Sequence, residues 1–175
     1  MPDKISLATV WLDGCSGCHM SFLDIDEVLL NIADRVDLVY SPLVDNKVFP
    51  DMVDLTLVEG GVSSVEDRAK IIKIRKHTRT LVSLGDCAIT GNVPAMRNRY
   101  SVEVVQNRTY VENADVNTTP PTQVVPELLP MIQPVHTVID VDFYLPGCPP
   151  PAPLIRDVLL ALLNGETPDI SPRFG

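Results

Sequence analysis

Short apolar runs that are typical of buried β-strands recur through the first half of the chain. The first is "ISLATVWL" at residues 5–12, and "VDLVYSP" follows at residues 36–42. "VDLTLVEGG" at residues 53–61 and "TRTLVSLGDC" at residues 78–87 have the same character. Runs of this length that end in turn-forming residues predict four strands.

Segments with helical spacing lie between these predicted strands. After the first strand, apolar residues recur at roughly helical intervals between acidic ones: Met20, Leu23, Val28, Leu29 and Ile32. Ser63 and Glu66 form an S-x-x-E capping box, which predicts a helix from there to about Lys76. Because the strands are apolar almost throughout and alternate with helices, we expect an α/β fold, an open parallel sheet with helices on both faces.

The pattern breaks down in the second half of the chain, between about residues 91 and 133. The stretch "NTTPPTQVVPELLPMIQP" has too many prolines for a central strand or a long helix. The apolar residues of this stretch favour a segment that is held in place by contacts with other groups over a segment that is disordered. Periodicity returns in "PAPLIRDVLLALLNG", which predicts a helix at residues 152–164 with Gly165 as its C-cap. We therefore expect one domain over residues 1–175, with a proline-rich irregular segment at about 108–134.

The composition is that of a soluble globular protein. The chain has 175 residues, of which 45% are hydrophobic and 21% charged, enough for one domain with a real core. Its net charge of −9 argues against a nucleic-acid backbone or an anionic membrane as partner. The first residues do not resemble a signal peptide, and no run approaches the roughly 18 apolar residues of a membrane span. These features predict a cytoplasmic location.

Four cysteines lie in loops beside the predicted strands. Cys15 and Cys18 follow the first strand, Cys87 follows the fourth, and Cys148 follows another strand-like stretch before the last helix. Loops after parallel strands lie along one edge of a sheet, so these distant cysteines should converge. Each cysteine sits close to Gly or Pro, in "DGCSGC", "GDC" and "PGCPP". Such loops let the backbone approach an inorganic group and donate N–H groups to its sulfurs.

Several metal or redox sites fit parts of this cysteine pattern. "CSGCH", with Cys15, Cys18 and His19, matches a c-type haem attachment site, and its C-x-x-C alone suits a redox dithiol. Both readings leave Cys87 and Cys148 unexplained. Structural zinc usually uses two C-x-x-C pairs, and this chain has one. Four converging thiolates favour a 4Fe–4S cluster over zinc, dithiol and haem, with His19 in the first helical turn and without a ligand role.

Glu59 ends the third predicted strand, in "LTLVEGGVSS". Because loops after parallel strands lie along one edge of a sheet, the Glu59 carboxylate should lie near the cysteines. The two glycines that follow Glu59 would let the backbone pack against a cluster or a partner. An acid in this place could take up a proton together with an electron, or approach an iron if a thiolate moved. The alternative is that Glu59 caps the following helix or binds a backbone N–H.

Three motifs together resemble the small subunit of nickel–iron hydrogenases: "CSGC" after a first strand, "GDCAITGNVPAMRN", and "PGCPPP" before a helix. The resemblance is strongest to the short subunit of the cytoplasmic, bidirectional NAD-reducing hydrogenase, and it covers residues 5–166. It implies a flavodoxin-like fold with one 4Fe–4S cluster, proximal to the nickel–iron centre, that passes on electrons from hydrogen oxidation. The implied cluster ligands are Cys15, Cys18, Cys87 and Cys148.

The same resemblance implies partners that carry the other cofactors. In this family the large subunit supplies two C-x-x-C pairs for the nickel–iron site. No G-x-G-x-x-G follows a predicted strand, so NAD is expected in a separate diaphorase module. The resemblance also allows FMN in the complex, although no residue of this chain indicates a flavin site. The irregular segment then becomes a loop ordered against a partner subunit, or else a plain surface loop.

Two other functions remain open at this point. The related cluster-binding subunit of a complex I-like NADH:quinone oxidoreductase resembles the chain in fold. That subunit characteristically carries adjacent cysteines at its first motif, where this chain has two residues between them. A zinc-stapled scaffold subunit without a redox role is the rival from a different class. In the hydrogenase interpretation the chain is a subunit of an enzyme, a hydrogen:NAD⁺ oxidoreductase, and is not active alone.

Overall fold

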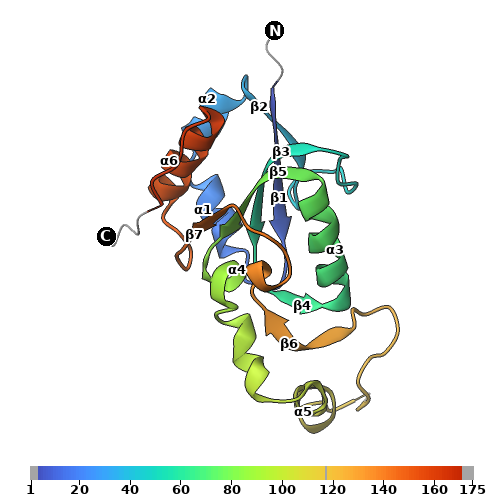
Figure 1. The fold of residues 1–175 in the computed structure, drawn as a ribbon. Coiled ribbons are helices and arrows are strands. Elements are labelled where there is room, and N and C mark those ends of the chain that lie inside the picture. Colours follow the sequence, from blue (N-terminus) through green and yellow to red (C-terminus); the bar gives the residue numbers. More distant parts are fainter. Residues whose placement is uncertain (1–3, 117, 171–175) are drawn as a thin grey trace.

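A five-stranded parallel sheet forms the centre of the molecule (Figure 1). The computed structural model describes residues 4–116 and 118–170. The strand order is β2-β1-β3-β5-β7, the flavodoxin-like order when only the strands of this sheet are counted. The strands are β1 (Ile5–Trp11), β2 (Val36–Tyr40), β3 (Val53–Glu59), β5 (Thr78–Leu84) and β7 (Phe143–Leu145).

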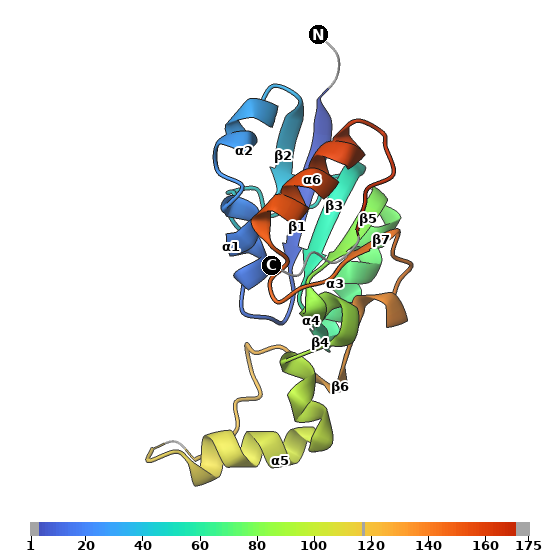
Figure 2. The same ribbon diagram turned by 90° about the vertical axis from the view of Figure 1, so that its left-hand side faces the viewer.

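Helices cover both faces of this sheet. On one face lie α1 (Gly17–Leu23), α2 (Glu27–Ile32) and α6 (Ala152–Leu163), and on the other lies α3 (Val65–Lys76) (Figures 1 and 2). No helix within the described residues has the length and apolar character needed to cross a membrane. The predicted α/β fold, with a parallel sheet between helices, is confirmed.

Successive strand residues point into two separate hydrophobic cores. Leu7 and Leu57 belong to the core under α1 and α6, whereas their neighbours Ala8 and Val58 belong to the core under α3. Because both faces are buried, the central strands are apolar at nearly every position. This is why the sequence shows continuous apolar runs and not alternation.

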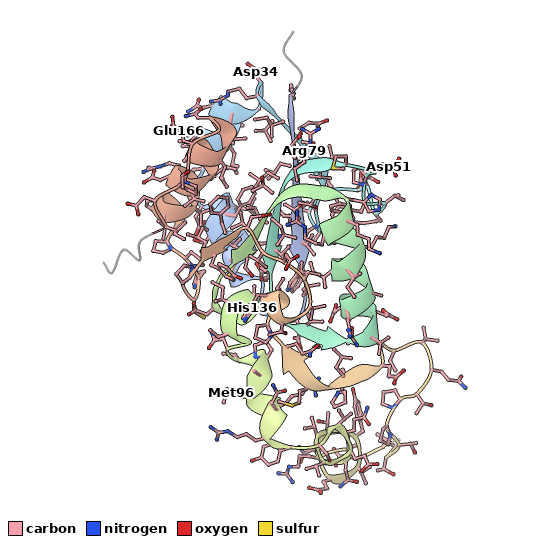
Figure 3. The ribbon with its side chains drawn as sticks, in the orientation of Figure 1. Asp34, Asp51, Arg79, Met96, His136 and Glu166 are labelled. Carbon is pink, nitrogen blue, oxygen red and sulfur yellow. The ribbon has the colours of Figure 1, made fainter. Side chains whose placement is uncertain are left out.

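The carboxyl ends of the strands meet at the end of the sheet where α4 (Asp86–Thr90) begins. In Figure 3, His136 lies beside this end, and Asp34 and Glu166 lie at the opposite end. The loops that carry the cysteines all follow strands at the α4 end.

Several element boundaries differ from those expected. The single helical stretch expected after Cys18 is two short helices, α1 and α2, because Asp26 between them has a positive φ of 50°. The helix at the end of the chain stops at Leu163, with Asn164 as its C-cap, and Gly165 follows with φ 73°. Gly165 is therefore the residue after the cap, where left-handed glycine is common.

The capping box of α3 is one residue later than predicted. Ser64 Oγ accepts a hydrogen bond from the Asp67 N–H at 3.0 Å, and Asp67 Oδ2 accepts one from the Ser64 N–H at 3.1 Å. Ser63 and Glu66 have the same spacing in the sequence, but Ser64 is the residue with extended backbone at the helix start. The helix still ends at Lys76, as predicted.

Further short elements lie outside the central sheet and its covering helices. They are β4 (Val62–Ser64), the 3₁₀ helix η1 (Pro94–Arg99), α5 (Val102–Asn107), the π-helical turn η2 (Arg108–Glu112), β6 (Leu128–Gln133) and the 3₁₀ turn η3 (Val135–Thr137). α5 and η2 project from the body as an arm (Figure 2). β6 pairs with β4 in a separate antiparallel sheet, so Pro130 does not interrupt the central one.

Candidate metal centre

The four cysteines come together in one small pocket at the carboxyl end of the sheet. Cys15 follows β1, Cys18 lies in α1, Cys87 lies in α4 after β5, and Cys148 follows β7. The other residues that line the pocket are Gly17, Glu59, Gly60, Asp86, Gly147 and Pro149. Cys15 and Cys148 are exposed, Cys87 is half-buried and Cys18 is buried, and none forms a disulfide. The expected convergence of these thiols is therefore present in the structure.

Glycine lets the chain pass close to these thiols. Gly85 precedes α4 with φ 82°, and a Cβ atom added there would lie 2.3 Å from Cys18 Sγ. At Gly147, with φ 139°, an added Cβ would lie 2.5 Å from Pro150 Cα. Both positions combine a left-handed backbone with a close approach, so a larger residue would displace a cysteine-bearing loop.

Hydrogen bonds tie the cysteine-bearing loops to one another. The Asp86 N–H donates to the Gly147 carbonyl at 2.9 Å, and the Gly147 N–H donates to Asp86 Oδ1 at 2.8 Å. Ser21 Oγ in α1 donates to the Pro150 carbonyl at 2.6 Å. These hydrogen bonds connect the segments that carry Cys18, Cys87 and Cys148 to one another.

Removing the Asp86 carboxylate should loosen this arrangement. In Asp86→Ala the Gly147 N–H loses its acceptor, and we expect a loss of about 1–2 kcal/mol in the free energy of unfolding. Asp86→Asn keeps an oxygen in the same place and serves as the matched control. Urea denaturation of both variants measures the difference, and equal stabilities would show that the bond between the two loops contributes nothing.

Two of the thiols that line the pocket, Cys18 and Cys87, hold their protons more tightly than free cysteines do. Burial raises the pKa of Cys18 most strongly, and the negative charges of Glu59 and the other three cysteines raise it further. Burial also raises the pKa of Cys87, and a hydrogen bond from the Val93 N–H partly opposes this. A metal group that binds here must therefore displace protons from the buried thiols.

Glu59 lies among the residues that line the cysteine pocket and is only 2% exposed. Glu59 Oε2 accepts a hydrogen bond from the His19 backbone N–H at 2.6 Å and lies 2.6 Å from His19 Nδ1. Of the alternatives for Glu59, the structure shows the bond to a backbone N–H, in the preceding helix α1. It does not show a cap of the following helix, since Ser64 and Asp67 cap α3. Contact of Glu59 with a cluster stays a prediction.

The sequence alone did not predict the partner of Glu59. His19 is 4% exposed within α1, and its Nε2 atom has no hydrogen-bond partner among the residues that the structure describes. It was expected in the first helical turn, where it lies, but the pairing with Glu59 was missed. Glu59 ends β3 and His19 lies in the helix that follows β1, so both are at the same edge of the sheet. This shared position is the signal from which their pairing could have been predicted.

The Glu59–His19 interaction should contribute measurably to stability. Glu59→Leu leaves the His19 N–H buried without an acceptor, and we expect a loss of about 3 kcal/mol in the free energy of unfolding. Glu59→Gln retains an acceptor oxygen and should lose less than half of that. Thermal and urea unfolding measure both variants, and a Leu variant as stable as the Gln variant would contradict this role.

The donor set fits a sulfur-preferring metal group. Four thiols from three strand-end loops surround the pocket, and soft thiolate donors select iron–sulfur clusters or zinc over hard cations. Across residues 4–116 and 118–170, no three His, Cys, Asp or Glu side chains are grouped around a site for a single metal ion. The close glycine contacts and the backbone N–H groups near the sulfurs are features that suit an inorganic cluster.

Solved structures include a protein that resembles this chain along almost its whole length. A crystal structure of NAD⁺-reducing [NiFe]-hydrogenase in the H₂-reduced state matches with a TM-score of 0.89 and 40% identity, covering 99% of this chain and 96% of that one. A [NiFeSe]-hydrogenase of Dm. baculatum, at 18% identity and a TM-score of 0.61, shares the fold alone.

Curated relatives match as well. The chain is 36% identical over 173 residues to a subunit of the vhu F420-non-reducing hydrogenase of Methanococcus voltae, covering 97% of this chain and 60% of the relative. It is 38% identical over 172 residues to the delta subunit of the NAD-reducing hydrogenase HoxS of Cupriavidus necator, covering 95% and 82%. It spans only 56–60% of the length of four F420-non-reducing hydrogenase subunits that it matches.

A family model agrees with these matches. Residues 15–162, which include all four cysteines, match the family described as NADH ubiquinone oxidoreductase, 20 Kd subunit. The relatives at 34–38% identity are subunits of hydrogenases, which are oxidoreductase complexes. The resemblance expected from the cysteine motifs is thereby confirmed, and the chain belongs to the NADH ubiquinone oxidoreductase 20 kDa subunit family.

Proposed function

We propose that this chain is the electron-transfer small subunit of a nickel–iron hydrogenase. In this proposal Cys15, Cys18, Cys87 and Cys148 hold one 4Fe–4S cluster. The observation that carries it is the convergence of four thiols from three strand-end loops in one pocket. Relatives at up to 38% identity, whose names are those of NAD-reducing and F420 hydrogenases, support it. When bound, the cluster would accept and release one electron at a time.

The chain's own residues would build and shield the site. The four cysteines would lose their thiol protons and bind the cluster through sulfur, with Cys18 buried and Cys15 and Cys148 nearer the surface. Gly85 and Gly147 keep the backbone close, and Asp86 joins the two loops across the pocket. Glu59 is the candidate for an acid beside the cluster. None of these residues is assigned a role in hydrogen chemistry itself.

Partner subunits would supply the remaining cofactors. The chain has a single C-x-x-C pair, so we assign the nickel–iron centre to a large subunit. NAD, and FMN if the complex has it, are assigned to a diaphorase module, because this chain has no G-x-G-x-x-G. The name of the Cupriavidus necator relative favours NAD as the final acceptor. We place the complex in the cytoplasm, with neither nucleic acid nor membrane as a partner.

A complex I-like role is the second candidate, and the description of the matching family favours it. There the same cysteine pocket would pass electrons toward a quinone. The C-x-x-C spacing of Cys15 and Cys18 is the sequence feature that favours the hydrogenase. The two candidates require different partner subunits, so the assembly can be tested directly.

Affinity purification of the tagged chain from its own cells, under anaerobic conditions, tests the proposed assembly. We expect a large subunit that contains nickel, together with flavin-containing diaphorase subunits, and hydrogen-dependent NAD reduction by the complex. The chain expressed alone should show no hydrogen uptake. Hydrogen uptake by the chain alone, or partners that reduce quinone and lack nickel, would overturn the proposal.

A further inference from the structure

N–H groups are directed at three of the four cysteine sulfurs. The Gly17 N–H donates to Cys15 Sγ at 3.4 Å, and the Val93 N–H donates to Cys87. Asn92 Nδ2 donates to Cys148 Sγ at 3.4 Å, across 56 residues of sequence. The first two donors belong to the backbone. Asn92 differs because its donor is a side chain, which a substitution can remove without rebuilding the loop.

The turn after α4 holds Asn92 in position. Gly91 ends the helix with φ 84°, and Asn92 follows with φ 33°. The Gly91 N–H donates to the Cys87 carbonyl at 3.0 Å, and the Asn92 N–H donates to Thr90 Oγ1 at 3.3 Å. Asparagine accepts a positive φ better than other residues that have a side chain. The same residue therefore completes the turn from the Cys87 helix and reaches the Cys148 loop.

We propose that Asn92 is a positioning residue that raises the reduction potential of the cluster through its hydrogen bond to Cys148 Sγ. The inference rests on the proposed function, because it requires the cluster that the four cysteines would hold. The bond also connects the Cys87 and Cys148 loops, in addition to the link between Asp86 and the Gly147 backbone. Asn92 thus acts through Cys148 and has no direct part in the reaction.

The direction of the effect follows from charge. Reduction adds an electron, and part of the added negative charge resides on the ligand sulfurs. A hydrogen bond to a more negative acceptor is stronger, so the Asn92 amide stabilises the reduced state more than the oxidised one. Removing the amide should therefore make the cluster harder to reduce.

Three variants separate the donor from its surroundings. Asn92→Gly removes the amide and keeps a residue that tolerates the positive φ. Asn92→Asp keeps the size of the side chain but replaces the donor with a carboxylate. Asn31→Asp makes the same chemical change on an exposed position of α2, at the opposite end of the sheet (Figure 1). It serves as the control for added charge.

The measurement is an EPR-monitored redox titration of the anaerobically purified complex. The signal that disappears in Cys87→Ser identifies the cluster of this chain. In Asn92→Gly we expect the equilibrium between reduced and oxidised cluster to shift about tenfold toward the oxidised form, equivalent to about 59 mV for one electron. Asn92→Asp should shift it further in the same direction, and Asn31→Asp should leave it unchanged.

A second measurement does not depend on how well the variants fold. Wild-type complex labelled with ¹⁵N only at asparagine side-chain amides should show a ¹⁵N coupling to the reduced cluster by pulsed electron–nuclear double resonance. Absence of this coupling, or an unchanged potential in Asn92→Gly with normal iron content, would overturn the inference and leave the proposed function intact. A wild-type complex in which this chain carries no cluster would overturn the proposed function itself.

Discussion

Cys87→Ser is expected to lower both the iron content of the protein and its hydrogen-dependent NAD reduction by at least about tenfold. Substitution of residues that only hydrogen-bond to a metal ligand already lowers metal affinity or activity by about 10- to 100-fold. The substitution changes one atom, in a half-buried side chain at the start of α4. Oxygen replaces the soft sulfur donor that an iron–sulfur cluster requires. Ser variants of Cys15, Cys18 and Cys148 should behave in the same way. Metal analysis and activity assays of the purified complex measure the two losses.

Two controls accompany the cysteine variants. Diaphorase activity, the oxidation of NADH by artificial electron acceptors, should survive, because electron transfer within the diaphorase module does not need this cluster. Ser83→Ala removes a fully buried hydroxyl from β5, the strand before Cys87, that has no hydrogen-bond partner in the described part of the chain. This variant should keep its iron and its activity. Full hydrogen-to-NAD activity in Cys87→Ser would remove Cys87 from the proposed ligand set.

Gly85→Ala is expected to prevent assembly of the site and to cost about 3 kcal/mol in the free energy of unfolding. The added Cβ would lie 2.3 Å from Cys18 Sγ and 3.3 Å from the Gly147 carbonyl oxygen, at a backbone φ of 82°. Relief of the clash requires the Cys18 sulfur to turn away from the pocket. Stability and iron content should therefore fall together, as measured by urea denaturation and metal analysis.

Gly165→Ala is the matched control for Gly85→Ala. Gly165 also has a positive φ, 73°, but an added Cβ there would have no atom within 4 Å. It carries the backbone strain without the clash, so we expect a loss of about 1 kcal/mol and a normal iron content. If Gly85→Ala behaves like Gly165→Ala, the close approach to Cys18 is not needed for the site.

The sheet and the gathering of the cysteines could be predicted because each depends on a strong local signal. A parallel sheet covered on both faces requires strands that are apolar almost throughout, and residues 53–61 and 78–87 show this directly. Because the carboxyl ends of parallel strands share one edge of a sheet, Cys87 and Glu59 could be placed at the same end of the sheet without any knowledge of side-chain contacts. Both lie in the lining of the cysteine pocket.

Other features depend on contacts between distant residues, which a periodic pattern does not report. The β4–β6 pair joins segments more than 60 residues apart, and Pro130 makes β6 look unlike a strand. The Glu59–His19 and Asn92–Cys148 hydrogen bonds span 40 and 56 residues. The capping box was displaced by one residue because Ser63 and Ser64 both have an acidic residue three positions later, and only the backbone distinguishes them.

Metal and sulfide analysis of the anaerobically purified chain, combined with its visible spectrum, tests the central claim most directly. One 4Fe–4S cluster held by the four cysteines predicts about four iron atoms and about four acid-labile sulfides per chain, with absorption at about 400 nm that bleaches with dithionite. A colourless protein with zinc in place of iron would contradict the account.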